Sequence, residues 1–265
     1  SIHVFLQDTT DEQIASALIA AIETPDNQDA YRKDLLQYFD VDGSFQVLLM
    51  TCEGLDSMDT VERKKLSYRI QVYLEDITHN GSFFYYNSDF VLVANALSEE
   101  YLCHLVEGAI KRGKRRMPGL QLCVGIGSRC MDISQLSVSY QRAKAAAHIA
   151  MTQKKQVVKF DDCGLFRLLY MVKDKEILKE METECLEALE EYDRRYHADY
   201  VETLKSYLKH NGSIQAVAAE LYTHRNTVLY RIGNIRKILG NELKTPEERL
   251  PYQIAFYIRN MHGQI

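Results

Sequence analysis

Several features that would place this 265-residue chain in a specialised class are absent from its sequence. No apolar run approaches the roughly 20 residues that a bilayer-spanning helix needs, so we expect no membrane partner. No signal peptide precedes the first amphipathic stretch, and the chain opens with Ser1 rather than Met. We therefore expect a fragment of a longer protein.

Clusters of metal-binding or redox-active residues are also missing. The six cysteines form no CxxC pair and show no regular spacing, and the eight histidines form no HExxH motif and no Cys/His cluster. Structural zinc sites depend on such spacings. We expect reduced core cysteines in a cytoplasmic protein, with no metal and no cofactor. A redox or metal role for the cysteines is the alternative.

Charge is unevenly distributed along the chain. From His197 onward there are nine Lys or Arg against six Asp or Glu, a net charge of +3. Residues 1–196 hold 23 against 31, a net charge of −8. A basic tail on an acidic body can bind a polyanion locally while the body stays in solution.

Hydrophobic periodicity divides the chain into a mixed region and a helical region. Before Tyr196, helical and strand-like patterns alternate around a central hairpin, which predicts an α+β domain with a largely antiparallel sheet. After Tyr196, strand patterns disappear. The expected helices are 10–22, 29–39, 57–78, 98–110, 134–150, 162–171, 174–193, 199–210, 213–221, 224–239 and 246–261, and the expected strands are 44–52, 82–86, 89–97, 120–127 and 156–160.

A basic run, KRGKRR at 111–116, follows the expected end of one helix at Ile110. Such a run could contact nucleic acid. A charge cluster between a helix end and a loop is more often a solvated surface, and we favour that interpretation.

The helical region contains a helix-turn-helix pattern. Ser213 is placed to cap one short helix, and Thr223 is placed to cap the next after a turn formed by residues 222–224. Two short helices joined by such a turn are typical of DNA-binding proteins. The alternative is a small helical bundle with a solvated face.

The second helix of this pair has two distinct faces. An apolar stripe is spaced by four, three and four residues, and the opposite face is polar and carries no acidic residue. Arg225 and Arg231 lie towards its edges, from which they could reach phosphates. Gly233, costly within a helix, is explained if a neighbouring backbone approaches closely. The stripe consists of Val228, Ile232, Ile235 and Leu239, and the polar face of Asn226, Tyr230, Gly233 and Lys237.

The stretch GSIQAVAAELYTHRNTVLYRIGNIRKILG, followed by a Pro-Glu-Glu-Arg-Leu helix start, resembles the C-terminal helix-turn-helix of the PucR/CdaR family of bacterial transcriptional regulators, which is similar to the Fis-type fold. The HRNT block at 224–227 and the Tyr230-Arg231 pair carry the resemblance. It implies sequence-specific binding of a double-stranded DNA operator with helix 224–239 in the major groove. The expected DNA-binding residues are Thr223, His224, Arg225, Asn226, Thr227, Tyr230, Arg231, Asn234 and Lys237.

The region from about 44 to 160, and above all VGIGSRCMDISQLSVSYQRAKAAAHIA, is similar to the GGDEF-like domain of CdaR-type regulators, a fold related to diguanylate cyclases. The hairpin that carries Gly-Gly-Asp-Glu-Phe in a working cyclase reads Tyr-Asn-Ser-Asp-Phe at 86–90. A lone Asp89 cannot assemble the metal and phosphate arrangement of such a site. We therefore expect no catalytic residues and no enzyme activity, and expect Asp89 to serve the turn and Phe90 the core. The alternative is a nucleotide- or small-molecule-sensing, cyclase-like domain protein with an accessory helical module.

The expected organisation is a helical lead-in at 1–43, a degenerate GGDEF-like (cyclase-palm-like) α+β domain at 44–172, a connecting helix at 173–196 and a helix-turn-helix domain at 197–265. A homodimer is expected, because one helix-turn-helix reads few base pairs. Binding of a small-molecule effector and a role in dimerisation or signal relay both fit the front domain and stay open. The apolar stripe of the connecting helix could pair subunits or pack on the sheet, and we favour packing within the chain.

Overall fold

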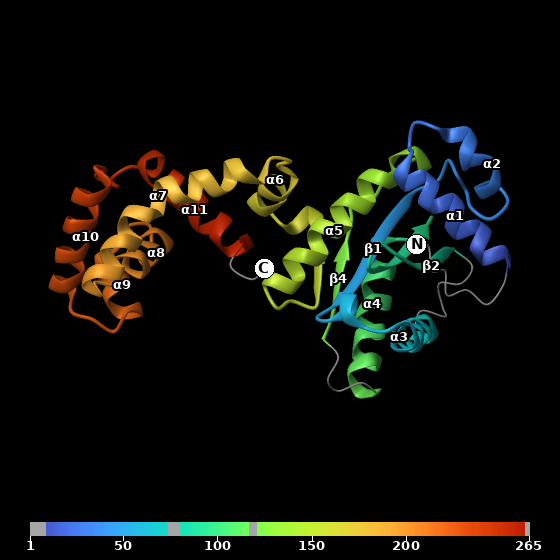
Figure 1. Ribbon diagram of the computed structural model, residues 1–265, viewed down its shortest axis with the longest axis horizontal. Helices are drawn as coiled ribbons and strands as arrows, with labels where there is room; N and C mark the ends of the chain where they lie inside the picture. The colour runs from blue at the N-terminus through green and yellow to red at the C-terminus, as the bar shows by residue number, and fades with distance from the viewer. Residues whose placement is uncertain (1–8, 74–79, 117–120, 263–265) are drawn as a thin grey trace. The chain divides into compact units, whose positions relative to one another are not determined.

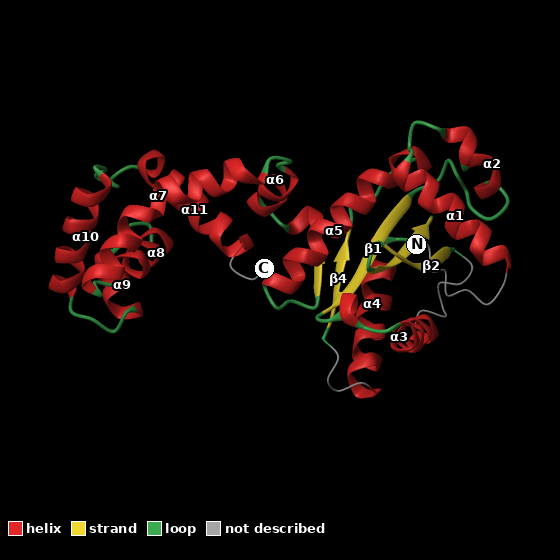
Figure 2. Ribbon diagram, viewed as in Figure 1, coloured by secondary structure: helices red, strands yellow, loops and turns green. Residues whose placement is uncertain are grey.

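The computed structural model describes residues 9–73, 80–116 and 121–262. Its contacts divide the chain into two units, with the division between Leu168 and Leu169. The first unit combines helices with a sheet, and the second is helical (Figures 1 and 2). This is the α+β domain followed by an all-α domain that the sequence predicts. Within the part of the chain described, no helix is both long and apolar enough to cross a bilayer.

The first unit is built on a mostly antiparallel sheet. In the described residues the sheet has five strands in the order β2-β3-β1-β4-β5, and only β4 and β5 are parallel. The strands are β1 (Phe45–Cys52), β2 (Gly81–Tyr86), β3 (Asp89–Asn95), β4 (Leu122–Ile126) and β5 (Val157–Lys159). The helices are α1 (Thr9–Glu23), α2 (Arg32–Leu35), α3 (Thr60–Tyr73), α4 (Glu99–Arg116), α5 (Leu136–Thr152) and α6 (Leu165–Met171), the last of which crosses into the second unit.

Both faces of the sheet are buried, because strand residues alternate between two apolar cores. Val47 and Leu49 of β1 face a core that α1, α2 and α5 complete. Leu48 and Met50 face the opposite core, which α3 and α4 cover. Residues of the expected lead-in at 1–43 therefore pack into the same unit as the sheet (Figure 2).

Two glycines allow α5 to lie directly against the sheet. A Cβ atom built on Gly125 would lie 2.1 Å from the backbone nitrogen of Ala147, and one on Gly127 would lie 2.1 Å from the carbonyl oxygen of Ser139. No side chain fits at either position without displacing α5. The Ser139 hydroxyl also accepts a hydrogen bond from the Val47 backbone amide at 3.0 Å.

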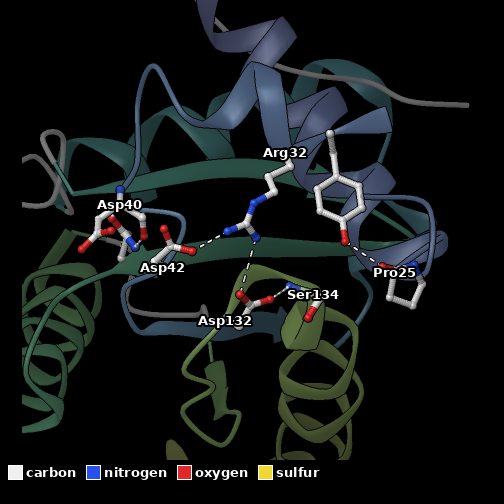
Figure 3. A network of polar contacts seen from close by, with 8 residues as sticks. Pro25, Arg32, Asp40, Asp42, Asp132 and Ser134 are labelled. Carbon is white, nitrogen blue, oxygen red and sulfur yellow. Dashed lines mark hydrogen bonds and ion pairs between the residues drawn. The ribbon is translucent and has the colours of Figure 1, made fainter. Parts of the chain in front are cut away.

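A polar network joins α2 to the segment that precedes α5 (Figure 3). The Arg32 guanidinium pairs with Asp42 and also reaches Asp132, 3.5 Å from Nη1 to Oδ2. Asp132 in turn accepts a hydrogen bond from the Ser134 backbone amide at 2.7 Å. Hydrogen bonds from Ser134, together with the nearby Arg32, hold the pKa of Asp132 below its usual range.

Two expected helices have other bounds in the structure. The helix expected at 29–39 is α-helical only over the four residues of α2, Arg32–Leu35. The helix expected to stop at Ile110 continues as α4 to Arg116, so the basic run at 111–116 is helical and is no loop. Lys and Arg are good helix formers, which explains why the run extends the helix. Lys111 and Arg115 are exposed, as expected of a solvated surface.

The second unit is a helical bundle with its own core. Its helices are α7 (Lys175–Tyr196), α8 (Tyr200–Lys209), α9 (Ile214–Glu220), α10 (Arg225–Leu239) and α11 (Pro246–His262). Val217, Val228, Ile232 and Ile235 are fully buried, and they pack with apolar residues of α7, α8 and α11. Three of the four predicted stripe residues of α10 are therefore buried, and Leu239 packs partly buried against them.

Helix α7, which covers most of the expected connecting helix at 173–196, contributes to this core. Its Leu186 and Leu189 are fully buried among residues of the helical unit. The Asp193 carboxylate accepts hydrogen bonds from the backbone amides of Tyr200 at 2.8 Å and Val201 at 2.9 Å, and so caps α8. The favoured packing of this apolar stripe within the chain is confirmed for Leu186 and Leu189, but the partners are helices of the second unit, above all α8 and α11, in place of the sheet.

Candidate nucleic-acid interface

Helices α9 and α10 meet at a tight turn. The Ser213 hydroxyl accepts a hydrogen bond from the Ala216 amide and caps α9, as the sequence predicts. The cap of α10 differs from the prediction. His224 Nδ1, and not Thr223, accepts a hydrogen bond from the Asn226 amide at 3.2 Å. The cap was misplaced by one residue because histidine is not among the usual capping types.

The N-terminal half of α10 carries exposed polar side chains. Arg225, Asn226 and Thr227 are exposed, and Tyr230 retains 70% of its accessible surface. No acidic residue lies in the first turn. The positive end of the helix dipole therefore meets no carboxylate of its own helix, an arrangement that favours an anion. Lys237 is exposed further along the helix.

Two of the predicted DNA-binding residues instead have partners on or next to α8. Arg231 Nη2 lies 3.2 Å from Asp199 Oδ2, and its Nη1 donates to the Thr203 hydroxyl at 3.2 Å. Asn234 Nδ2 donates to the Tyr200 hydroxyl at 2.9 Å. These contacts fix the side of α10 that faces α8.

Gly233 lies in the middle of α10, where the sequence led us to expect a close neighbouring backbone. Apart from its chain neighbours and the backbone of α10 itself, no atom of the described residues lies within 4 Å of a Cβ atom built there. The expectation of a close approach within this chain was wrong. Any steric need for glycine must come from outside the described chain.

Glu220 at the end of α9 ties that helix to α8. Its carboxylate accepts hydrogen bonds from the Lys209 ammonium and the Ser206 hydroxyl, and it lies 2.9 Å from His210 Nε2. Hydrogen bonding to Lys209 first, and then to Ser206 and His210, lowers the pKa of Glu220 to about 2. The first helix of the pair is therefore fixed to the bundle by a charged cluster that the sequence did not reveal.

Taken together, the structure brings Arg225, Asn226, Thr227 and Tyr230 onto the exposed side of α10, with Lys237 towards its far end. His224 caps the helix, Thr223 is half-buried in the turn, and Arg231 and Asn234 face α8. Of the nine predicted residues, six are exposed, His224 included, and Thr223, Arg231 and Asn234 are half-buried. A helical projection could not supply this distinction, because it contains no information about neighbouring helices.

The β2–β3 hairpin is the other region that the sequence singled out. Asn87 and Ser88 form a two-residue turn with φ values of +47° and +69°, the geometry of a primed turn. Phe90 is fully buried and stacks on Phe83 at 5.8 Å between ring centroids, so its expected core role is confirmed. Asp89 pairs with Tyr86 in the register next to the turn.

The hairpin shows no assembled metal site. Within the described ranges, no three His, Cys, Asp or Glu side chains gather closely enough to hold a metal ion. Two tyrosines lie close to the hairpin. The Tyr86 hydroxyl donates a hydrogen bond to Glu23 Oε1 at 2.7 Å, and the ring centroids of Tyr86 and Tyr140 are 5.7 Å apart. Burial raises the pKa of Tyr140 to about 12, which keeps this phenol neutral.

The six cysteines are free thiols, and Cys52 and Cys130 are buried. Burial raises the pKa of each of these two thiols to about 11. Because the thiolate is the reactive form, neither side chain is poised for redox chemistry. The expected place in the core is confirmed for these two, whereas Cys103, Cys123, Cys163 and Cys185 are half-buried.

The fold and the α9–turn–α10 pair define a helix-turn-helix domain preceded by an α+β domain. Comparison with known families identifies both parts. Residues 200–258 match the PucR C-terminal helix-turn-helix domain, and residues 25–149 match the GGDEF-like domain. The C-terminal part of the chain is therefore similar to the PucR helix-turn-helix domain, and the part before it is similar to a GGDEF-like domain.

Named relatives come from Bacillus subtilis. The chain is 26% identical over 155 residues to the DNA-binding transcriptional activator AdeR, a match that covers 57% of this chain and 36% of AdeR. It is 28% identical to the proline-responsive transcriptional activator PutR over 45% of this chain and 30% of PutR. It is also 28% identical to the purine catabolism regulatory protein over 52% of this chain and 26% of that protein. The chain thus matches about a quarter to a third of these relatives' length.

Proposed function

We propose that this chain acts in a cytoplasmic bacterial transcriptional regulator and binds double-stranded DNA through α10. The observation that carries the proposal is the exposed, non-acidic N-terminal half of a helix whose opposite side is buried in a helix-turn-helix core. The relatives named as transcriptional activators and regulators support it.

The major groove of B-DNA admits one α-helix, and the N-terminal residues of a recognition helix reach the base edges. In this chain those residues are Arg225 and Asn226, both of which can form bidentate contacts with bases. The hydroxyls of Thr227 and Tyr230 suit phosphate contacts that fix the helix position, and Lys237 adds charge. Arg231 and Asn234 act in this scheme as supports that hold α10 on α8.

We further propose that the regulator binds as a homodimer and that the GGDEF-like domain has no catalytic role. One exposed helix reads a short sequence, and a symmetric pair reads two half-sites at one or more helical turns of spacing. In the first unit, Asn87 and Ser88 occupy the turn where a cyclase carries glycines. The GGDEF-like domain then binds an effector or pairs subunits.

The test is a selection of duplexes from a randomised pool with the full 265-residue chain, followed by binding titrations at several salt concentrations. We expect a selected sequence with two related half-sites and a binding constant that falls steeply with salt. Asn226→Ala should relax base preference at one position of each half-site. Arg195→Ala, which removes an exposed charge from α7, is the control and should leave binding within about twofold.

Two outcomes would contradict this proposal. One is the absence of any enriched duplex from a correctly folded chain. The other is turnover of a nucleoside triphosphate by the same chain in the presence of Mg²⁺, which would assign a catalytic activity to the GGDEF-like domain.

A further inference from the structure

Tyr222 occupies a backbone position that normally belongs to glycine. Helix α9 ends in a Schellman motif, in which the Thr223 amide donates to the Ala218 carbonyl at 3.0 Å and the Tyr222 amide donates to the Ala219 carbonyl at 3.4 Å. This motif places Tyr222 in the left-handed region with φ of +49°. At the end of α10 the corresponding position is Gly240, with φ of +61°.

The side chain of Tyr222 makes little contact with the rest of the described chain that could offset the cost of its positive φ. Tyr222 retains 98% of its accessible surface. Leu243 also has a positive φ, +54°, but its side chain is fully buried. Asn87 and Asn211 have positive φ as well, and asparagine tolerates this region. Tyr222 thus adopts an unfavourable backbone conformation that no packing inside the described chain offsets. Exposed Lys154 and His197 share the positive φ, so the location of Tyr222 beside α10, and not the angle alone, indicates a functional site.

The position of Tyr222 relative to α10 indicates what it contacts. It lies two residues before the cap His224 and three before Arg225, next to the end of α10 that carries the exposed polar residues. When the N-terminus of a recognition helix is in the major groove, the preceding helix crosses the sugar–phosphate backbone. The turn between the two helices then lies at the edge of the groove. Tyrosine hydroxyls at such places donate hydrogen bonds to phosphate oxygens.

We propose that Tyr222 contacts the DNA backbone at the edge of the major groove, with its hydroxyl on a phosphate oxygen and its ring against the adjacent sugar. This inference rests on the proposed DNA-binding function and adds to it a contact outside α10. It assigns Tyr222 a positioning role that carries no base preference, because phosphates are the same at every step. The solvent-exposed ring is the surface that such a contact buries.

The experiment compares Tyr222→Gly and Tyr222→Phe in the full chain. Glycine relieves the positive φ and removes the contact, so we expect an unchanged or higher Tm together with about tenfold weaker binding to the selected operator. The loss should be the same for operators with single base changes, so that base preference is preserved. Phenylalanine keeps the ring and should lose several-fold in affinity at unchanged stability.

His197→Gly is the matched control. His197 is an exposed residue with φ of +50° at the end of α7, so the substitution relieves the same backbone geometry elsewhere in the helical unit. We expect the same unchanged or higher Tm as for Tyr222→Gly, with binding within about twofold of the parent chain.

Three results would overturn the inference while leaving DNA binding intact: Tyr222→Gly binding as tightly as the parent, Tyr222→Gly lowering Tm, or a change in base preference. A shift in the monomer–dimer equilibrium without loss of affinity would instead assign the ring to a second copy of the chain. A parent chain that binds no duplex would contradict the proposed function itself, and the two failures are therefore distinguishable.

Discussion

Arg231 on α10 pairs with Asp199 at the start of α8, with 3.2 Å between Nη2 and Oδ2. The Arg231 side chain is only 23% exposed, whereas that of Asp199 is 69% exposed. The pair therefore orients Arg231 towards the bundle. It separates the residues of α10 that can reach a ligand from those that hold the helix in place.

The first prediction uses this separation. Arg231→Ala should lower the free energy of unfolding, and a double-mutant cycle with Asp199→Ala should give a coupling energy of about 1 kcal/mol or less, because the pair is partly exposed. Under conditions in which the parent and the Arg231→Ala variant are both folded, the variant should bind DNA with an affinity within about twofold of the parent. Arg225→Ala should instead bind at least tenfold more weakly. Equal losses for the two variants would show that Arg231 contacts DNA directly.

The second prediction concerns the cap of α10. His224→Ala removes the Nδ1 acceptor of the Asn226 amide and should cost about 1 kcal/mol of unfolding free energy in denaturant titrations. His224→Ser supplies a hydroxyl acceptor and should recover most of that loss. Failure of serine to recover stability would mean that the imidazole contributes through something other than the cap.

The third prediction concerns pH. The pKa of Glu220 falls from an ordinary 4.5 to about 2 in the folded chain. Because the folded pKa is the lower one, the contribution of Glu220 to stability is present above pH 4.5 and is lost as the pH falls towards 2. Between these values the unfolding free energy of the parent should decline more steeply than that of Glu220→Gln. Parallel curves for the two proteins would show that the cluster contributes nothing in solution.

The fourth prediction compares two glycines. Gly125→Ala places a Cβ atom 2.1 Å from the backbone nitrogen of Ala147, so it should cost about 3 kcal/mol or more. Gly233→Ala meets no described atom within 4 Å other than its chain neighbours and the backbone of α10, and should raise the unfolding free energy by up to about 1 kcal/mol through helix propensity. If Gly233→Ala also weakens DNA binding, the missing close neighbour of Gly233 is the DNA.

Local patterns predicted most of the fold. The sequence predicted the hairpin around Asn87 and Ser88 and the start of α11 at Pro246 at the observed positions. Turns and helix starts depend on the types of a few adjacent residues, so local patterns identify them. The end of α4 was missed because its basic residues were taken as a boundary although they favour helix. In such cases the charge of a segment and its backbone propensity point to different boundaries.

The candidate site was predicted less completely than the fold. The apolar stripe fixed which side of α10 is buried, and so placed Asn226 and Tyr230 on the outside. The partners of Arg231 and Asn234 come from α8, some 30 residues away in sequence, and no local pattern carries that information. The position of Tyr222 depends on a backbone angle, which residue type alone would assign to glycine.

The burial of Leu186 and Leu189 and the cap from Asp193 determine how small an autonomous DNA-binding piece can be. A fragment starting at His197 would expose the apolar surface that these leucines cover and would leave two amides of α8 without their acceptor. We therefore expect such a fragment to be largely unfolded, whereas one starting at Asp174 should fold cooperatively. The smallest part of the chain that folds by itself and binds DNA should therefore include α7, one helix more than the stretch that the sequence identifies as helix-turn-helix.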